Sequence, residues 1–346
     1  MRYGDEAKMR TARIKGEGGA YYHCMSRVIE RRFLLGEVEK AMFYRLMRSC
    51  EGFCGVRIVT YALMSNHFHI LVQIPEQGEI SDEVLLSRLG SLYSKTRVRE
   101  IGWELKGLRE KGDHEEAERL KASFTYRMGD VSEFFKTLKQ RFTQWYNRRH
   151  ARRGTLWEER FKSVLVEGRG NVLATIAAYI DLNALRAGLV TDPKDYRFCG
   201  YGEAVAGGSV ARAGLALVAE CLGQGMDWRA TGRAYRVYLY AKGETTSSKQ
   251  GFSAEEVKKV LAEGGKLSRS EVLRCRVRYF SDGVALGSRA FVEEVFEANR
   301  GRFGQKRKTG ARALRSAELG DVFTVRDLRR EAITVSQGGN REGGVD

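Results

Sequence analysis

The sequence lacks the long apolar runs of membrane proteins and the clustered cysteines of small disulfide-bonded proteins. Within its 346 residues, no stretch approaches the ~18 consecutive apolar residues that a membrane-spanning helix needs. Residues 1–19 are basic and polar, without the apolar segment of a secretory signal peptide. The six cysteines are scattered, and a chain of this length folds without disulfide bonds. We therefore expect reduced thiols in a cytoplasmic protein that does not bind membranes.

Acidic residues are too few to balance the basic ones. The chain has 44 Asp and Glu residues against 42 Arg and 18 Lys, which gives a formal net charge of +16. Arginine presents a planar set of donors that suits phosphate oxygens, so the excess favours a polyanionic partner. An ordinary basic surface is the alternative. Hydrophobic residues, at 42%, are enough to form a core, and the length suggests about two domains.

The order of the predicted elements indicates an α+β fold. Strands are expected over 21–28, 56–64, 67–74 and 160–166. Helices are expected over 38–54, at the apolar positions between 131 and 145, and over 171–187. This β-α-β-β-α-β-α order is typical of a ferredoxin-like antiparallel sheet with helices on one face.

Composition divides the chain into five parts. A basic arm over 1–19 precedes a domain over 20–200, within which residues 93–128 form a charged helical insertion. The Gly-rich segment 201–214 is predicted to be a linker. We expect a mainly helical, basic C-terminal domain over 215–335 and a disordered tail over 336–346.

Two of the five histidines stand two positions apart in a predicted strand. Because strand side chains alternate, His67 and His69 share one face, about 7 Å apart at the backbone. Phe68 and Ile70 share the other face, which is apolar and is expected to contact the helices. Imidazole is the commonest metal ligand in proteins, so the pair favours a metal site. Two half-exposed histidines without a ligand are the alternative.

The predicted helix 171–187 adds two polar side chains one turn apart. Tyr179 and Asn183 lie beside its apolar stripe and point the same way. An amide oxygen ligates hard cations, and a phenol can act as a nucleophile. A core tyrosine beside a helix-interior asparagine is the alternative interpretation.

In this order the motifs resemble those of REP-associated tyrosine transposases, single-tyrosine members of the HUH endonuclease superfamily. The resemblance covers about residues 10–205, and the His-x-His and Tyr-x-x-x-Asn patterns together are its most specific part. One position departs from the family pattern, since Ala184 stands where a proline usually follows the asparagine; we expect the helix to continue through it. The matching blocks are Tyr22-His23, Ser26-Arg27, Ala62-Leu63-Met64-Ser65-Asn66-His67-Phe68-His69-Ile70-Leu71, Tyr146-Asn147-Arg148-Arg149-His150, Gly154-Thr155-Leu156-Trp157, Arg160-Phe161-Lys162-Ser163, Tyr179-Ile180, Asn183 and Arg186-Ala187-Gly188.

The resemblance implies a specific chemistry. In that family the His-x-His pair and the helix asparagine hold one Mg²⁺ or Mn²⁺, which maps onto His67, His69 and Asn183. The helix tyrosine, here Tyr179, attacks a phosphodiester of single-stranded, hairpin-forming repeat DNA and forms a 5′-phosphotyrosine. The resemblance also implies a bacterial, nucleoid-associated protein that acts as a monomer or homodimer.

Tyr146 is a rival nucleophile, although its apolar spacing predicts a core position. His23, on the first predicted strand, either lies near the metal or simply fills the sheet, and we favour the structural interpretation.

Residues 139–163 carry eight Lys or Arg against two Glu, which favours contact with a DNA backbone. Trp157 is either a platform on which bases stack or an anchor in the core. The run 302–315 has six basic residues and no acidic one, so it is expected to touch nucleic acid, with a solvated linker as the alternative. The predicted nucleic-acid contacts are Arg27, Arg141, Arg148, Arg149, Arg152, Arg153, Trp157, Arg160, Lys162, Lys306, Arg307 and Lys308.

Three other functions are compatible with these residues. A non-catalytic regulator would bind DNA or RNA hairpins without cutting them. A metal-dependent hydrolase would cleave with activated water and leave no covalent protein–DNA product. A zinc-stabilised structural domain would bind zinc tightly and stoichiometrically.

Overall fold

The computed structural model describes residues 13–16, 19–221, 227–243, 283–314, 322–326 and 328. The predictions for most of the basic arm, for residues 244–282 and for the tail 336–346 lie outside the described residues. No helix in the described ranges combines the length and the apolar character needed to cross a bilayer.

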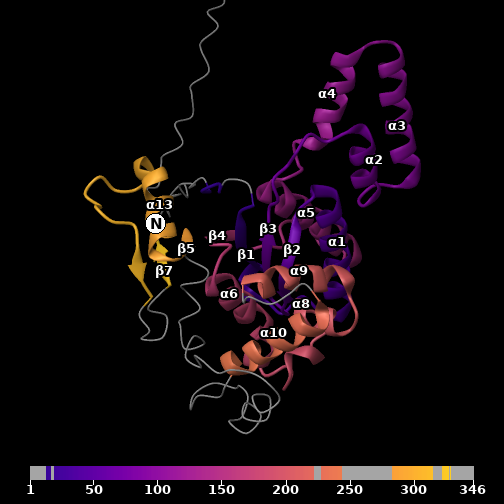
Figure 1. Ribbon diagram of the computed structural model, residues 1–346. Helices are drawn as coiled ribbons and strands as arrows, with labels where there is room; N and C mark the ends of the chain where they lie inside the picture. The colour runs from indigo at the N-terminus through magenta and orange to yellow at the C-terminus, as the bar shows by residue number, and fades with distance from the viewer. Residues whose placement is uncertain are drawn as a thin grey trace, which may run out of the picture.

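The centre of the fold is a four-stranded antiparallel sheet (Figure 1). Its strands are β1 (Tyr21–Arg27), β2 (Arg57–Leu63), β3 (His67–Gln73) and β4 (Lys162–Val166), in the order β2-β3-β1-β4. Helix α1 (Glu37–Cys54) connects β1 to β2, and α5 (Val131–Arg149) precedes β4. This order of strands and helices confirms the predicted ferredoxin-like arrangement.

Helices cover both faces of this sheet, so the prediction of helices on one face is wrong. On one face Phe68 of β3 packs against Phe43 of α1, with ring centroids 5.0 Å apart, and against Phe135 of α5 at 5.9 Å. The other face is covered by α6 (Asn171–Asp181), α8 (Gly200–Val205) and α9 (Ser209–Cys221). Every residue of α6 from 172 to 181 is buried, because the helix is apolar on all sides and needs cover all round.

The Gly-rich segment 201–214 is helical and is not the predicted linker. It contains α8 (Gly200–Val205) and the first half of α9 (Ser209–Cys221), both of which pack on β2. A Cβ atom at Gly214 would overlap the backbone oxygens of Ile58 and Val59. Glycine serves here for the close approach of a helix to a strand rather than for flexibility.

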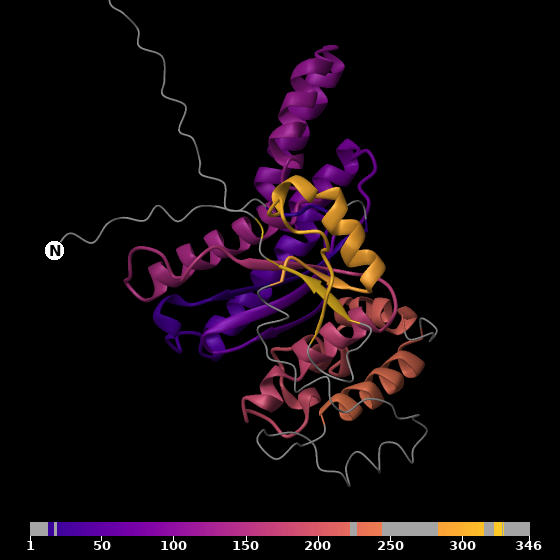
Figure 2. The same ribbon diagram turned by 90° about the vertical axis from the view of Figure 1, so that its left-hand side faces the viewer.

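The described C-terminal residues add strands as well as helices. Helix α10 (Trp228–Gly243) is followed, after a gap in the description, by β5 (Ala285–Gly287), α13 (Arg289–Ala298), β6 (Arg312–Ala313) and β7 (Phe323–Val325). Strand β5 pairs in parallel with β4, and β7 and β6 follow, which extends the sheet to seven strands (Figure 2). The prediction of a mainly helical region missed these strands, because two or three residues are too few to show an alternating pattern.

The charged segment 93–128 is helical, as predicted. Helices α3 (Lys95–Glu110) and α4 (His114–Thr125) form a hairpin that projects from the body of the molecule, with α2 (Asp82–Gly90) at its base (Figure 1). Arg109 of α3 bonds through Nε to Asp82 of α2 at 3.1 Å. Ser94 and Asp113 cap α3 and α4 by accepting hydrogen bonds from backbone N–H groups.

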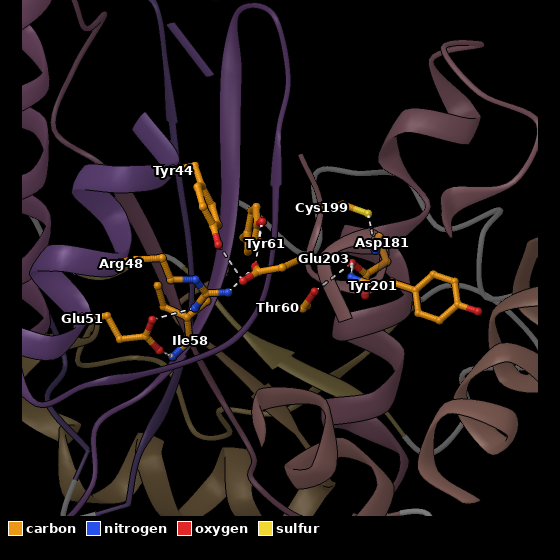
Figure 3. Close-up of polar contacts among 11 residues, drawn as sticks. Tyr44, Arg48, Glu51, Ile58, Thr60, Tyr61, Asp181, Cys199, Tyr201 and Glu203 are labelled. Carbon is orange, nitrogen blue, oxygen red and sulfur yellow. Dashed lines mark hydrogen bonds and ion pairs between the residues drawn. The ribbon is translucent and has the colours of Figure 1, made fainter. Parts of the chain in front are cut away.

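Two polar clusters, the first partly buried and the second buried, fix the helices on the second face of the sheet (Figure 3). In one, Arg48 of α1 forms ion pairs with Glu51 at 2.6 Å and with Glu203 of α8 at 2.5 Å. The hydroxyls of Tyr44 and Tyr61 donate to Glu203 at 2.8 and 2.9 Å. Because α1, β2 and α8 each contribute a member, the cluster joins α8 to two elements that are distant from it in sequence.

The second cluster surrounds Asp181, whose side chain is fully buried at the end of α6. Its carboxylate accepts hydrogen bonds from Thr60 Oγ1 of β2 at 2.8 Å, from Tyr235 Oη of α10 at 2.6 Å and from the backbone N–H of Tyr201 at 3.1 Å. Burial raises the pKa of Asp181 to about 6, against the lowering effect of these donors.

Removing this carboxylate will destabilise the protein. For Asp181→Ala we expect the free energy of unfolding to fall by about 2–4 kcal/mol, because three buried donors lose their acceptor. Folding raises the pKa of Asp181. The contribution of Asp181 to the free energy of unfolding is therefore larger below the folded-state pKa and declines as the pH rises through that pKa. The loss in the variant should therefore be about 1 kcal/mol larger near pH 5 than near pH 7. Urea denaturation at both pH values measures it.

Asp195→Ala is the matched control, since Asp195 is exposed. Its free energy of unfolding should stay within about 0.5 kcal/mol of the wild type. Equal losses in the two variants would contradict the anchoring role of Asp181.

Candidate functional site

The two histidines of β3 lie on the sheet face that α6 covers. His69 is 2% exposed and His67 is half-buried, and their ring planes are nearly perpendicular with centroids 5.1 Å apart. Phe68, between them, points into the core on the opposite face. The alternation that the sequence predicts is thus present, and it brings the two imidazoles together.

Each of these histidines is oriented by a neighbour. His69 Nδ1 lies 2.9 Å from Nε2 of His23, and His67 Nδ1 lies 2.6 Å from Oδ1 of Asn66. In both rings Nδ1 is used within the protein, which leaves Nε2 as the ring atom for a ligand. His23 is 1% exposed and lies on β1, and its ring stacks on His69 with centroids 5.1 Å apart. His23 is thus a buried residue of the sheet, as the structural interpretation predicts, and it also orients the ring of His69.

Both imidazoles are neutral at neutral pH. Burial lowers the pKa of His67 to about 4, and the nearby Arg27 acts in the same direction. Burial lowers the pKa of His69 well below its ordinary value, with His23 and His67 adding to the effect. Neutral imidazole is the form that ligates metals, so deprotonation would cost this pair nothing.

Tyr179 of α6 faces the histidines from the covering helix. Its ring centroid lies 5.7 Å from that of His69 and 6.1 Å from that of His23, edge-on in both cases, and the side chain is 3% exposed. Burial raises the pKa of the Tyr179 phenol, while the charges of Arg186 and Arg27 act to lower it. The structure therefore joins the His pair and the predicted nucleophile from two separate elements.

Asn183 begins a short separate helix, α7 (Asn183–Arg186), so the expected continuous helix 171–187 is wrong. The break is at Leu182, with φ −82° and ψ 0°. Asn183 Nδ2 donates to the backbone oxygens of Tyr179 at 3.0 Å and Ile180 at 3.1 Å. In a regular helix, these carbonyl oxygens accept hydrogen bonds from backbone N–H groups. Its Oδ1 remains as the atom that can ligate.

The donor set fits a divalent cation with mixed nitrogen and oxygen ligands. Among the described residues, no cluster of three or more His, Cys, Asp or Glu side chains could hold a metal ion. His67 and His69 supply two neutral nitrogens, so a third protein ligand has to be of another type. The Asn183 amide oxygen meets that requirement chemically.

Arg186 is a residue of the site to which the sequence motifs gave no role. Its guanidinium carbon lies 4.7 Å from the centroid of the Tyr179 ring, and Nη1 donates to the Tyr179 backbone oxygen at 3.2 Å. Burial lowers the pKa of Arg186 to about 10, so the group stays charged at neutral pH. Two sequence signals pointed to it: its place in the matching block Arg186-Ala187-Gly188 and its position about one turn after Asn183.

Tyr146 lies away from the histidines. It belongs to α5, which covers the opposite face of the sheet, and its ring stacks on His150 with centroids 4.2 Å apart. The side chain is 5% exposed, in agreement with the predicted core position. This geometry leaves Tyr179 as the tyrosine that faces the His pair.

Trp157 is an anchor in the core and offers no platform for bases. It is 6% exposed, and its Nε1 donates to Thr143 Oγ1 at 2.9 Å. Its ring packs edge-on against Phe68 with centroids 5.6 Å apart and against Phe43 at 6.1 Å. Of the two interpretations of this residue, the structure therefore supports the anchor.

Most of the predicted backbone-contact residues near α5 lie on the surface. The loop after α5 runs beside the end of β1, since Ile29 N donates to Leu156 O at 3.0 Å and Glu158 N to Arg27 O at 3.0 Å. Arg27 is half-buried and pairs in register with His67, so this loop adjoins the His67 end of the sheet. The exposed members are Arg148, Arg149, Arg153, Arg160 and Lys162, while Arg152 is half-buried.

Two other predicted contacts serve the fold. Arg141 is half-buried with its guanidinium carbon 5.6 Å from the centroid of the Tyr93 ring. Arg307 donates to the backbone oxygens of Thr309 and Gly310, both at 2.9 Å, and so shapes its own loop. Lys306 and Lys308 flank it and are exposed.

One family model matches the part of the chain that carries the His-x-His motif. Residues 18–105, which contain His67 and His69, match the family described as "Transposase IS200 like". A solved structure entitled "Structure of the REP associates tyrosine transposase bound to a REP hairpin" is 14% identical, covers 58% of this chain and 87% of its own, and aligns with a TM-score of 0.38. No curated protein matches the chain. The matched segment ends before Tyr179 and Asn183, whose placement comes from the geometry above. The resemblance of this chain to IS200-like transposases is thus confirmed over residues 18–105.

Proposed function

We propose that this protein is a metal-dependent endonuclease and strand-transferase that acts on single-stranded, hairpin-forming DNA through Tyr179. The observation that carries the proposal is the contact of the Tyr179 ring with His69, 5.7 Å between centroids, on a face where a second neutral histidine stands alongside. The family match of residues 18–105 supports the transposase class. Hairpin-forming repeat DNA is the substrate that the motif resemblance implies.

In the proposed reaction Tyr179 is the nucleophile. Its Oη attacks the phosphorus of a DNA phosphodiester, the new O–P bond forms, and the bond from phosphorus to the 3′ oxygen breaks. The phenol proton leaves to solvent and the 3′ oxygen takes one up, so the products are a 5′-phosphotyrosine and a free 3′-OH. The phosphodiester bond energy is retained in the protein–DNA link, and strand transfer reverses the step on a second 3′-OH.

A divalent cation would be held by His67, His69 and Asn183. When bound, it would polarise the scissile phosphate and offset the charge that develops on the 3′ oxygen. The protein's own contribution is orientation: His23 and Asn66 hold the two rings, and the Asn183 amide is tied to the backbone of the helix that carries Tyr179.

The proposed DNA path follows the basic loop beside the His67 end of the sheet. Arg148 and Arg153 are exposed and flank the turn after α5, and Arg27 connects that turn to the histidines. Arginines placed this way would neutralise backbone phosphates on either side of the attacked one.

Tyr179→Phe will abolish the covalent product. Labelled single-stranded oligonucleotides from the repeats that flank the gene are incubated with protein and Mn²⁺ and run on a denaturing gel. The wild type should give a shifted band, and the variant should lose it by about 1000-fold or more, because phenylalanine has no nucleophilic oxygen.

Tyr146→Phe is the matched control and should keep the band, since Tyr146 lies on the other face of the sheet. A band that survives in Tyr179→Phe would refute the assignment of the nucleophile. Cleavage without any covalent band in the wild type would favour an activated-water hydrolase, and tight binding with neither would favour a regulator.

Metal binding depends on the His pair. We expect His67→Ala and His69→Ala each to weaken Mn²⁺ binding by about 10-fold or more, because each removes a neutral nitrogen ligand. Isothermal titration with Mn²⁺ alone measures this without DNA. His114→Ala, which changes an exposed histidine of α4, should bind as the wild type does. Equal Mn²⁺ affinity in all four proteins would argue against a metal site on β3.

The basic loop should determine the salt dependence of DNA binding. For Arg148→Ala with Arg153→Ala, we expect the slope of log K against log salt concentration to become shallower by about 1.4, roughly 0.7 for each lost phosphate contact on single-stranded DNA. Fluorescence anisotropy at several salt concentrations measures the slope. Arg99→Ala, on the exposed surface of α3, serves as the control, and a slope unchanged in the double variant would move the DNA path elsewhere.

A further inference from the structure

The guanidinium of Arg186 has one unused donor edge inside the site. Nη1 is bonded to the backbone oxygen of Tyr179. Nε and Nη2 are shielded from solvent and have no hydrogen-bond partner among the described residues. An unsatisfied buried donor costs about 1–3 kcal/mol, and more when the group is charged, so this arrangement calls for a ligand.

The two unused atoms are the pair best suited to an oxyanion. In arginine, the N–H of Nε and one N–H of Nη2 point the same way and are parallel. That edge makes two simultaneous hydrogen bonds to two oxygens of one carboxylate or phosphate. The third nitrogen, Nη1, is the one that the protein uses here, and it holds the guanidinium against the Tyr179 ring.

The charge around Arg186 also calls for an anion. Among the described residues, Tyr179 is the only titratable group that acts to raise the pKa of this guanidinium, and no carboxylate does so. Arg27 adds a second positive charge, since both Arg27 and Arg186 act on His69. Buried arginines are ordinarily paired with acids, because an unpaired buried charge is costly. The missing counter-charge is thus expected to come from a bound molecule.

We propose that the Nε and Nη2 edge of Arg186 binds the two non-bridging oxygens of the phosphodiester that Tyr179 attacks. This inference rests on the proposed function and adds a residue to the same site. Arg186 would hold the phosphorus close to the tyrosine and oppose the extra negative charge that the phosphoryl oxygens gain as Oη approaches. It forms and breaks no covalent bond. In the free protein the same guanidinium lies against the Tyr179 ring, so one residue places both reacting partners.

A binding experiment tests this independently of cleavage. The full-length protein is labelled with ¹⁵N-arginine, and the Nε–H signal of Arg186 is identified as the one missing in Arg186→Lys. Added d(TpT) should shift this signal in the presence of Mg²⁺. The methylphosphonate analogue of d(TpT), which lacks one charged oxygen, should not. A signal unmoved by saturating d(TpT), or moved equally by both dinucleotides, would overturn the proposal whether or not Tyr179 forms a covalent product.

A kinetic experiment tests the same edge in the reaction. In single-turnover formation of the covalent band, Arg186→Gln should be about 100-fold slower than the wild type, and Arg186→Lys intermediate, since lysine keeps the charge without the paired donors. Arg197→Gln is the matched control, because Arg197 also lies over an aromatic ring, 4.9 Å from that of Phe198, but is exposed. A wild-type rate in a folded Arg186→Gln protein would refute the role of Arg186 and leave that of Tyr179 intact.

Discussion

The buried carboxylate of Asp181 determines where the candidate nucleophile lies. Helix α6 is apolar on every side, and apolar packing alone fixes neither its rotation nor its position along the sheet. Asp181 accepts hydrogen bonds from Thr60, Tyr235 and the backbone of Tyr201. Because each hydrogen bond has a defined geometry, together they fix the rotation of α6 and its position along the sheet. Tyr179 is two residues away on the same helix. Two of these three donors lie after residue 200, so segments that contain none of the His-Tyr-Asn set help to position Tyr179.

The side chains of strand β3 alternate between the two faces of the sheet, so that those of one face stabilise the core and those of the other form the candidate site. Phe68 contributes to an aromatic core with Phe43 and Phe135, while His69 faces α6. Because both faces are covered, the histidines are desolvated, and desolvation keeps them neutral. A sheet with one open face would have left them half-protonated near neutral pH and poorer ligands. The second layer of helices is thus a condition of the site as well as of the fold.

The sequence allowed the central sheet and the pairing of His67 with His69 to be predicted, since both follow from local periodicity. The same information did not reveal which elements cover the second face of the sheet. The apolar sequence of α6 predicts that this helix is buried, but it does not identify the element against which the helix packs. The Gly-rich composition of segment 201–214 predicts a linker, whereas Gly214 permits close contact between α9 and β2. Trp157 was equally compatible with the surface and the core, and only its contacts with Phe68 and Thr143 distinguish the two. Arg186 belongs to a matching sequence block, but that block assigns it no role, since the role depends on which of its nitrogens lack a hydrogen-bond partner.

The electrostatics of the site differ from those of a metal centre built on carboxylates. Two neutral imidazoles and an amide would leave the full charge of a bound cation uncompensated, and two arginines add to it rather than offset it. Such a site would bind an anionic ligand more strongly than water. The positive charges of the arginines attract an anion, whereas they stabilise bound water only if it ionises. Burial raises the pKa of the Tyr179 phenol, which disfavours a phenolate, and the charges of Arg186 and Arg27 oppose that rise. In the proposed reaction, the positive charge that would attract a phosphodiester would therefore also reduce the cost of ionising the Tyr179 phenol.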